Sequence, residues 1–172
     1  MIQVGQPAPQ FTAEAVSGDQ FVKVNLSDYA GKWVVLFFWP LDFTFVCPTE
    51  VTAFSKRLNE FKALGAEVVG ASIDSKFTHL AWKEKIGDIG YPMVSDITKE
   101  ISSLYEVLRE SDGVALRGLF IIDPDGMVRY EVVHDLSIGR NVDEVLRVLK
   151  ALQTGELCPV DWEEGMDTLG RA

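Results

Sequence analysis

The stretch Lys32–Gly65 reads KWVVLFFWPLDFTFVCPTEVTAFSKRLNEFKALG and combines two patterns that decide the fold. Its first part, Lys32–Trp39, is apolar almost without interruption, which is typical of a β-strand covered on both faces. From Pro48 to Leu64, apolar residues recur every three or four positions, which indicates an amphipathic helix that Gly65 ends. A buried strand that leads into a helix is the beginning of an α/β unit.

Strand and helix patterns continue on both sides of this stretch, after an extended N-terminal segment at Gly5–Pro9. We expect further strands at Phe21–Leu26, Glu67–Ile73, Met93–Ser95, Leu119–Ile122 and Val128–Val133, and further helices at Lys76–Ile86, Lys99–Leu108 and Val142–Leu152. The last two strands flank Asp123-Pro124-Asp125-Gly126, a turn signal that predicts a hairpin. The sequence therefore predicts an α/β fold with a central mixed sheet flanked by helices.

The length of 172 residues, with no repeat and no linker, predicts one domain spanning residues 1–172. After Gly155 the tail GELCPVDWEEGMDTLGRA has no clear period, although it contains Cys158 and Trp162. We interpret residues 155–172 as a C-terminal arm that packs on another surface, such as a second chain.

Composition and charge exclude several classes of protein. With 47% apolar and 24% charged residues the balance is that of a globular protein, and no apolar run approaches the roughly 20 residues of a membrane span. The net charge of −10 disfavours nucleic acid and anionic membranes as partners. The N-terminal MIQVGQPAPQ lacks the basic and apolar regions of a signal peptide, so we expect a cytoplasmic protein, or one inside an organelle after removal of a transit peptide.

The two cysteines, Cys47 and Cys158, are too few for a structural zinc site without histidine ligands. The two histidines, His79 and His134, stand in no ligand-like spacing with them. We therefore expect no metal and no other cofactor.

Cys47 stands between the most buried strand and the helix that Pro48 begins. A thiol at a helix N-terminus lies at the positive end of the helix dipole, where a thiolate is stabilised. Cys47 is thus a candidate nucleophile, although a buried structural cysteine is the alternative.

Three neighbours of Cys47 fit a reactive thiol. Thr44 can donate a hydrogen bond to the sulfur or to a bound oxygen, and Pro40 can shield the site without adding a donor. Glu50 is either a first-turn acid favoured by the helix dipole or a group that holds a cation against the sulfur. Because Cys47-Pro48-Thr49-Glu50 lacks a second cysteine, a C-x-x-C dithiol reductase or isomerase is disfavoured.

Phe37–Glu50, FFWPLDFTFVCPTE, resembles the peroxidatic loop of peroxiredoxins, P-x-x-x-[TS]-x-x-C, with Pro40, Thr44 and Cys47 at its fixed positions. Four further segments resemble the same family in the same order: FTHLAW (Phe77–Trp82), RGLFIIDPDG (Arg117–Gly126), IGRNVDEVLRVLKALQ (Ile138–Gln153) and GELCPVDW (Gly155–Trp162). The chain is identified as similar to typical two-cysteine peroxiredoxins, the group of the alkyl hydroperoxide reductases and thioredoxin peroxidases.

The resemblance implies a thioredoxin-like fold and a thiol-dependent peroxidase that reduces hydrogen peroxide and organic hydroperoxides. Cys47 would be the peroxidatic cysteine, oxidised to a sulfenic acid as water or alcohol leaves. Cys158, on the C-terminal arm, would be the resolving cysteine, which in this family comes from the second chain of a dimer. The disulfide would then join two chains, and its formation would require local unwinding around Cys47.

The resemblance also implies roles for other side chains. Arg117 would stabilise the thiolate and polarise the peroxide, although a surface arginine on a strand is the alternative. Glu50 would orient Arg117, and Thr44 would hydrogen-bond the peroxide. Trp82 matches an aromatic packed near the active loop, and core filling explains it equally well.

The partners that the resemblance implies are peroxides, an electron donor and further copies of the chain. We expect thioredoxin as the donor, with a dedicated flavoprotein disulfide reductase as the alternative. We expect a homodimer, and the family commonly forms decameric rings of five dimers when reduced.

Two other functions remain alternatives. One is a thioredoxin-like chaperone or binding module, against which the combination of Pro40, Thr44, Cys47 and Arg117 argues. The other is an acyl-transfer enzyme, which requires a histidine base that no motif links to Cys47.

Overall fold

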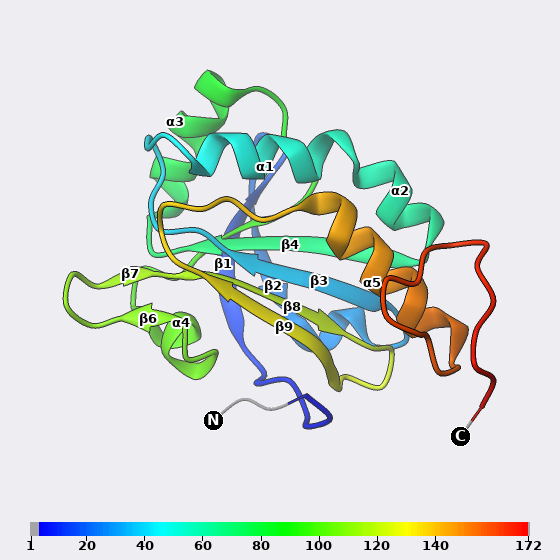
Figure 1. Ribbon diagram of the computed structural model, residues 1–172. Coiled ribbons are helices and arrows are strands. Elements are labelled where there is room, and N and C mark those ends of the chain that lie inside the picture. Colours follow the sequence, from blue (N-terminus) through cyan, green and yellow to red (C-terminus); the bar gives the residue numbers. More distant parts are fainter. Residues whose placement is uncertain (1–3, 172) are drawn as a thin grey trace. The chain divides into compact units, whose positions relative to one another are not determined.

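The computed structural model describes residues 4–171 and divides the chain into two compact units, Met1–Arg140 and Asn141–Ala172 (Figure 1). Each unit is described by itself, and the single domain expected from the sequence stays a prediction. No helix within the described residues has both the length and the apolar character needed to cross a bilayer.

The first unit is built on a seven-stranded mixed sheet in the order β2-β1-β5-β4-β3-β8-β9. Its strands are β1 (Thr12–Ser17), β2 (Gln20–Asn25), β3 (Trp33–Phe38), β4 (Ala66–Ser72), β5 (Met93–Ser95), β8 (Arg117–Ile122) and β9 (Val128–His134). Strands β3, β4 and β5 are parallel neighbours, whereas β8 and β9 form the expected antiparallel hairpin. The expected central mixed sheet is confirmed.

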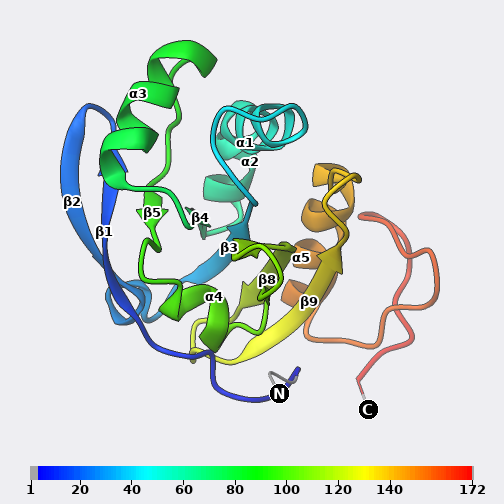
Figure 2. The same ribbon diagram turned by 90° about the vertical axis from the view of Figure 1, so that its left-hand side faces the viewer.

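Helices cover both faces of this sheet (Figures 1 and 2). Helices α1 (Cys47–Lys56), α2 (Leu58–Ala63) and α3 (Lys76–Ile86) lie on one face, and α4 (Glu100–Leu104) lies on the other. Parallel strands need such crossover helices, because a short turn cannot return the chain to the start of the next parallel strand. Every residue of β8 is buried, as are residues 34–38 of β3, which fits strands covered on both faces.

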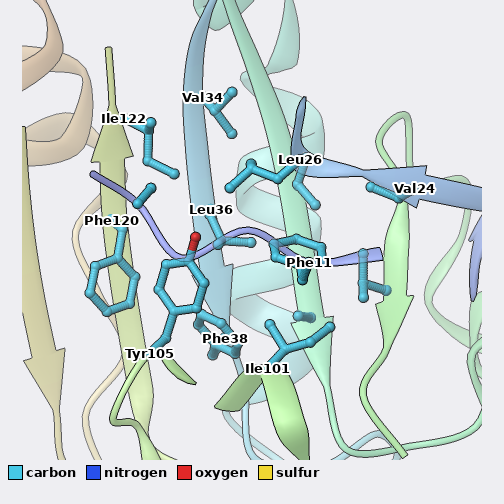
Figure 3. Close-up of a cluster of buried hydrophobic side chains, with 14 of the residues drawn as sticks. Phe11, Val24, Leu26, Val34, Leu36, Phe38, Ile101, Tyr105, Phe120 and Ile122 are labelled. Carbon is cyan, nitrogen blue, oxygen red and sulfur yellow. The ribbon is translucent and has the colours of Figure 1, made fainter. Parts of the chain in front are cut away.

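The apolar core has one layer on each face of the sheet. Alternate residues of a strand point to opposite faces, so Leu36 and Phe38 join the layer under α4, where Tyr105 and Phe120 pack against Phe38. Figure 3 shows this layer, with Tyr105 beside Phe38 and Phe120. Phe37 points to the opposite face, where its ring stacks on Phe54 of α1 with ring centroids 4.4 Å apart.

Three local features differ from the sequence-based expectation. The helix expected from Pro48 to Leu64 breaks at Arg57 (φ −98°, ψ 6°), and the apolar spacing continues across the break, so the pattern could not reveal it. The helix expected to reach Leu108 ends at Leu104, because Glu106 takes a left-handed conformation (φ 54°) and reverses the chain. A small separate hairpin follows, made of β6 (Leu108–Arg109) and β7 (Val114–Ala115).

Strand β1 was not expected at all. Its sequence TAEAVS contains few of the β-branched and aromatic residues that favour strands. It pairs with β2 on one side and β5 on the other, so its sheet neighbours determine its structure.

The second unit consists of helix α5 (Val142–Thr154) and the C-terminal arm. The Asn141 side chain caps the start of α5 by accepting from the Glu144 amide, and Gly155 ends it with φ 64°. The arm folds back on this helix, where Arg147 Nη1 donates to the Trp162 carbonyl at 2.8 Å.

Candidate active site

Cys47 is the first residue of α1, and its side chain is buried. The chain reaches it from the carboxyl end of β3 through the loop of residues 41–46. Strand β8 runs antiparallel to β3, with Leu119 opposite Phe37, so Arg117 lies at the same end of the sheet as Cys47. Since residues two apart share a face, Arg117 also points to the face that α1 covers.

Arg117 makes three contacts that fix its guanidinium beside the sulfur. Its Nη1 donates to Cys47 Sγ at 3.5 Å and to Glu50 Oε2 at 2.7 Å, and its Nε donates to the Leu136 carbonyl at 2.8 Å. The residue is 3% exposed, which contradicts the alternative of a surface arginine. A buried guanidinium at this distance places a positive charge and a hydrogen-bond donor beside the sulfur.

Glu50 accepts hydrogen bonds from two arginines, of which only Arg117 was expected from the sequence. Arg140 donates to it from the backbone amide (2.6 Å), Nε (2.8 Å) and Nη2 (2.9 Å), and Arg140 Nη1 donates to the Gly118 carbonyl. Burial acts to raise the pKa of Glu50, but the hydrogen bonds and charge of Arg140, with the charge of Arg117, lower that pKa below its usual value. Glu50 is therefore a carboxylate that fixes two buried cations.

The resemblance covers Arg140 within Ile138–Gln153, but no local pattern marks it as part of a site. The only signal was an arginine directly before the helix cap Asn141, which a surface position explains equally well. In the structure its guanidinium lies over the Phe37 ring, 5.2 Å from the centroid, and its side chain is 1% exposed.

A pocket of about 260 Å³ opens beside the sulfur. Its lining consists of Pro40, Leu41, Thr44, Phe45, Val46, Cys47, Asp112, Val114, Arg117 and Leu136. Thr44 Oγ1 donates to the Leu41 carbonyl at 2.9 Å, which holds the hydroxyl within the loop. Four of the residues expected from the sequence, Pro40, Thr44, Cys47 and Arg117, thus line one pocket, and Glu50 lies directly behind it.

Two further contacts hold the elements around Cys47. Trp82 of α3 is buried, and its ring centroid lies 6.4 Å from that of Phe43 in the loop of residues 41–46. Trp82 is thus an aromatic residue near this loop. The Tyr91 hydroxyl, from the segment before β5, donates to the carbonyl of Val51 in α1 at 2.6 Å. Burial raises the pKa of Tyr91 well above its usual value, so the hydroxyl stays a donor.

Cys158 lies in the second unit, four residues after the end of α5. Its thiol is half-buried, faces Thr154 Oγ1 at 3.5 Å and donates to the Ala151 carbonyl at 3.7 Å. Both cysteines are free thiols.

The arrangement can perform nucleophilic chemistry at sulfur. A buried sulfur, a guanidinium and a threonine hydroxyl surround a pocket that admits a small electrophile. Within residues 4–171 no hydrogen bond joins either histidine to Cys47: His79 pairs with Asp42, and His134 faces the Ile138 carbonyl. Neither histidine is therefore hydrogen-bonded to Cys47 as the base that acyl transfer needs. The described residues contain no group of three or more His, Cys, Asp or Glu side chains suited to a metal ion.

The sequence matches the model of the AhpC/TSA family over residues 4–131. It is 56% identical to a putative peroxiredoxin in the rubredoxin operon of Clostridium pasteurianum, over 96% of this chain and 98% of that protein. It is also 56% identical to a chloroplastic 2-cysteine peroxiredoxin of Chattonella marina var. antiqua, over 98% of this chain and 92% of that protein.

Solved structures give the same result. The reduced 2-Cys peroxiredoxin of Plasmodium vivax is similar with a TM-score of 0.93 at 47% identity, covering 96% of this chain and 91% of that one. The AhpC of Mycobacterium tuberculosis is similar with a TM-score of 0.85 at 42% identity, covering 95% and 99%. These matches confirm the expected thioredoxin-like α/β fold.

Proposed function

Since this chain belongs to the AhpC/TSA family and is a peroxiredoxin, a thiol-dependent peroxidase that acts on peroxides, we propose that Cys47 is the sulfur that attacks the peroxide. The observation that carries this proposal is the 3.5 Å contact between Arg117 Nη1 and the buried Cys47 sulfur. Cys158, by contrast, has only Thr154, Ala151 and Glu156 as hydrogen-bond partners within residues 4–171, and none of these is a cation.

The proposed first step is attack of the Cys47 thiolate on one peroxide oxygen. The S–O bond forms as the O–O bond breaks, and the sulfur is oxidised to a sulfenic acid. The leaving oxygen takes a proton and departs as water or an alcohol. Arg117 and Thr44 would meet the charge that develops on the oxygens, while Pro40 shields the sulfur and Glu50 orients the guanidinium.

The proposed second step joins Cys47 to Cys158. The Cys158 sulfur attacks the sulfenic sulfur, water leaves, and a disulfide forms. We place the two cysteines on different chains, because a peroxiredoxin of the typical two-cysteine type resolves between the chains of a dimer. Thioredoxin would then return both sulfurs to thiols by disulfide exchange, with a flavoprotein disulfide reductase as the alternative donor.

Stopped-flow oxidation of the reduced protein by hydrogen peroxide tests the proposal, with a Cys158→Ser variant as the matched comparison. The wild type should react far faster than free cysteine and give a disulfide-linked dimer on a non-reducing gel. Cys158→Ser should react once at a similar rate and then stop, with a sulfenic acid at Cys47 that dimedone labels. A label at Cys158 in the wild type, or a rate no greater than that of free cysteine, would refute the assignment.

We also propose a homodimer that assembles into a decamer. Strand β9 is the last of the sheet and leaves an edge on which a second sheet can pair. A second surface carries the exposed rings of Phe21 and Phe77, 5.2 Å apart, with Lys76 Nζ 5.0 Å from the Phe21 centroid. Size-exclusion chromatography in reductant should therefore give a species larger than a dimer, and elution as a monomer would contradict both interfaces.

We propose a cytoplasmic location, because the mechanism requires both cysteines as thiols, which a reducing compartment maintains. Cell fractionation tests it, and recovery of the protein outside the cytoplasm would contradict it.

A further inference from the structure

The loop of residues 41–46 is held by a buried polar cluster that the proposed chemistry does not use. Asp42 and His79 have side chains that are 0% exposed, and Asp42 Oδ2 lies 2.6 Å from His79 Nδ1. Asp42 Oδ1 accepts from Trp39 Nε1 at 2.8 Å, and the second ring nitrogen of His79, Nε2, lies 3.0 Å from the Val94 carbonyl. The cluster therefore joins the residue that follows β3, the loop of residues 41–46, α3 and β5.

The loop needs such an anchor because its backbone is strained. Phe43, directly after Asp42, has φ 56°, a left-handed conformation that a bulky residue rarely adopts. On one side of Phe43 stands the Asp42 cluster, and on the other side Thr44 bonds back to the Leu41 carbonyl. Cys47 follows Thr44 by three residues. The conformation at Phe43 therefore determines where the Thr44 hydroxyl and the Cys47 sulfur lie.

The two hydrogen-bond partners of His79, Asp42 and the Val94 carbonyl, determine how many protons the Asp42–His79 pair holds. A carbonyl only accepts, so Nε2 must carry a hydrogen to bond Val94. The 2.6 Å contact between Nδ1 and Asp42 Oδ2 also needs a hydrogen, because two lone pairs at that distance repel. The pair therefore holds two protons, one more than a carboxylate beside a neutral imidazole, whichever residue carries the second.

We propose that His79 is a positioning residue: by sharing a proton with Asp42 it holds the loop of residues 41–46, and with it Thr44 and Cys47, in the reactive conformation. Loss of that proton releases the loop. This inference rests on the proposed role of Cys47, and it adds to that role a residue outside the pocket.

The direction of the pH dependence follows from the groups around Asp42. Two titratable groups face it, His79 from α3 and Asp74 after β4, whose Oδ2 accepts from the Asp42 amide at 2.9 Å. Burial raises the pKa of Asp42, against the hydrogen bond and charge of His79, and the charge of Asp74 raises it further. An unfolded aspartate loses its proton above about pH 4. The contribution of protonated Asp42 to the stability of the folded loop is therefore complete below that pH. It is lost as pH rises through the raised pKa of Asp42.

Two variants separate this role from simple packing. Asp42→Asn can keep all three bonds without the extra proton, because its amide nitrogen donates to His79 Nδ1 and its oxygen accepts from Trp39. His79→Gln can still donate to the Val94 carbonyl, but it leaves the Asp42 carboxylate without its donor. His134→Gln changes the other histidine of the chain and is the control.

The measurement is the rate of Cys47 oxidation by hydrogen peroxide from neutral to alkaline pH, with thermal melts to verify folding. We expect His79→Gln to be slower than wild type by roughly tenfold or more at neutral pH, a factor that corresponds to about 1.4 kcal/mol. The ratio of the Asp42→Asn rate to the wild-type rate should grow as pH rises, while His134→Gln should follow wild type throughout.

A spectroscopic readout does not depend on activity. In wild type, proton NMR should show a far-downfield resonance from the proton between Asp42 and His79, absent from Asp42→Asn. A folded His79→Gln with the wild-type rate, or a constant ratio of the Asp42→Asn and wild-type rates at every pH, would overturn the inference. If wild type itself reacts no faster than free cysteine, the proposed function fails, whereas the resonance still reports on the shared proton.

Discussion

Replacing Arg117 by glutamine is expected to slow the reaction of Cys47 with peroxide by about 100- to 1,000-fold. The guanidinium is the charged group that touches the sulfur, at 3.5 Å, and it is buried. Loss of one preorganised donor to a developing charge costs an enzyme about that factor. Glutamine removes the charge, and it cannot bond the sulfur, Glu50 and the Leu136 carbonyl together as the guanidinium does.

The measurement is the second-order rate constant for hydrogen peroxide, obtained from stopped-flow tryptophan fluorescence. Arg117→Lys retains a charge but only one nitrogen, so its rate should lie between those of wild type and Arg117→Gln. Arg129→Gln, which removes an arginine paired with Asp123 at the opposite end of the hairpin, is the control and should react like wild type. A rate for Arg117→Gln within roughly threefold of wild type, far below the loss of one such donor, would exclude Arg117 from the chemistry.

Replacing Glu50 by glutamine is expected to have the largest effect on stability, a loss of about 3–5 kcal/mol in the free energy of unfolding. The carboxylate is the shared counter-ion of two buried arginines, whose side chains are 3% and 1% exposed. The neutral amide leaves both buried cations without a charge partner. Breaking a buried ion pair costs more than the pair contributes, because an uncompensated charge remains.

Urea unfolding of the reduced protein at neutral pH measures this effect. Glu67→Gln is the matched control, since it removes a carboxylate that pairs with Lys32 near the surface, and its cost should be within about 1 kcal/mol. Equal losses in the two variants would show that the Glu50 cluster contributes no more than a surface pair.

The same experiment has a defined pH dependence. Because the arginines lower the pKa of Glu50 in the folded protein, its contribution is complete above the unfolded value of about 4.3 and is lost as pH falls through the lowered value. The difference between wild type and Glu50→Gln should therefore be largest at neutral pH and shrink below about pH 4. A difference that grows in acid would contradict the sign.

The features that could be predicted from the sequence are those with a local signal. The apolar run before Trp39 specifies a buried strand by itself, and Pro48 marks the helix start that places Cys47. Arg117, in contrast, lies 70 residues from Cys47, and only the family resemblance linked the two before the structure showed them in contact.

Other contacts that depend on tertiary packing escaped prediction. Arg140 reaches Glu50 over 90 residues, and no pattern around it signals a buried charge. His79 stood within a quoted family segment, yet its pairing with Asp42 depends on how α3 packs against the loop. Strand β1 has weak strand propensity, and pairing on both sides determines its structure. Each of these features is decided by tertiary packing, which periodicity does not encode.

The hydrogen bond from Tyr91 to the Val51 carbonyl limits how far Cys47 can travel. With Glu50 held by two arginines and Val51 held by Tyr91, helix α1 can fray only through Cys47, Pro48 and Thr49. Three fully extended residues span about 10 Å, against roughly 4.5 Å along a helix, so Cys47 gains only about 5–6 Å of reach from its tether. In the proposed disulfide, any approach of the two sulfurs beyond that reach would therefore have to come from the segment that carries Cys158.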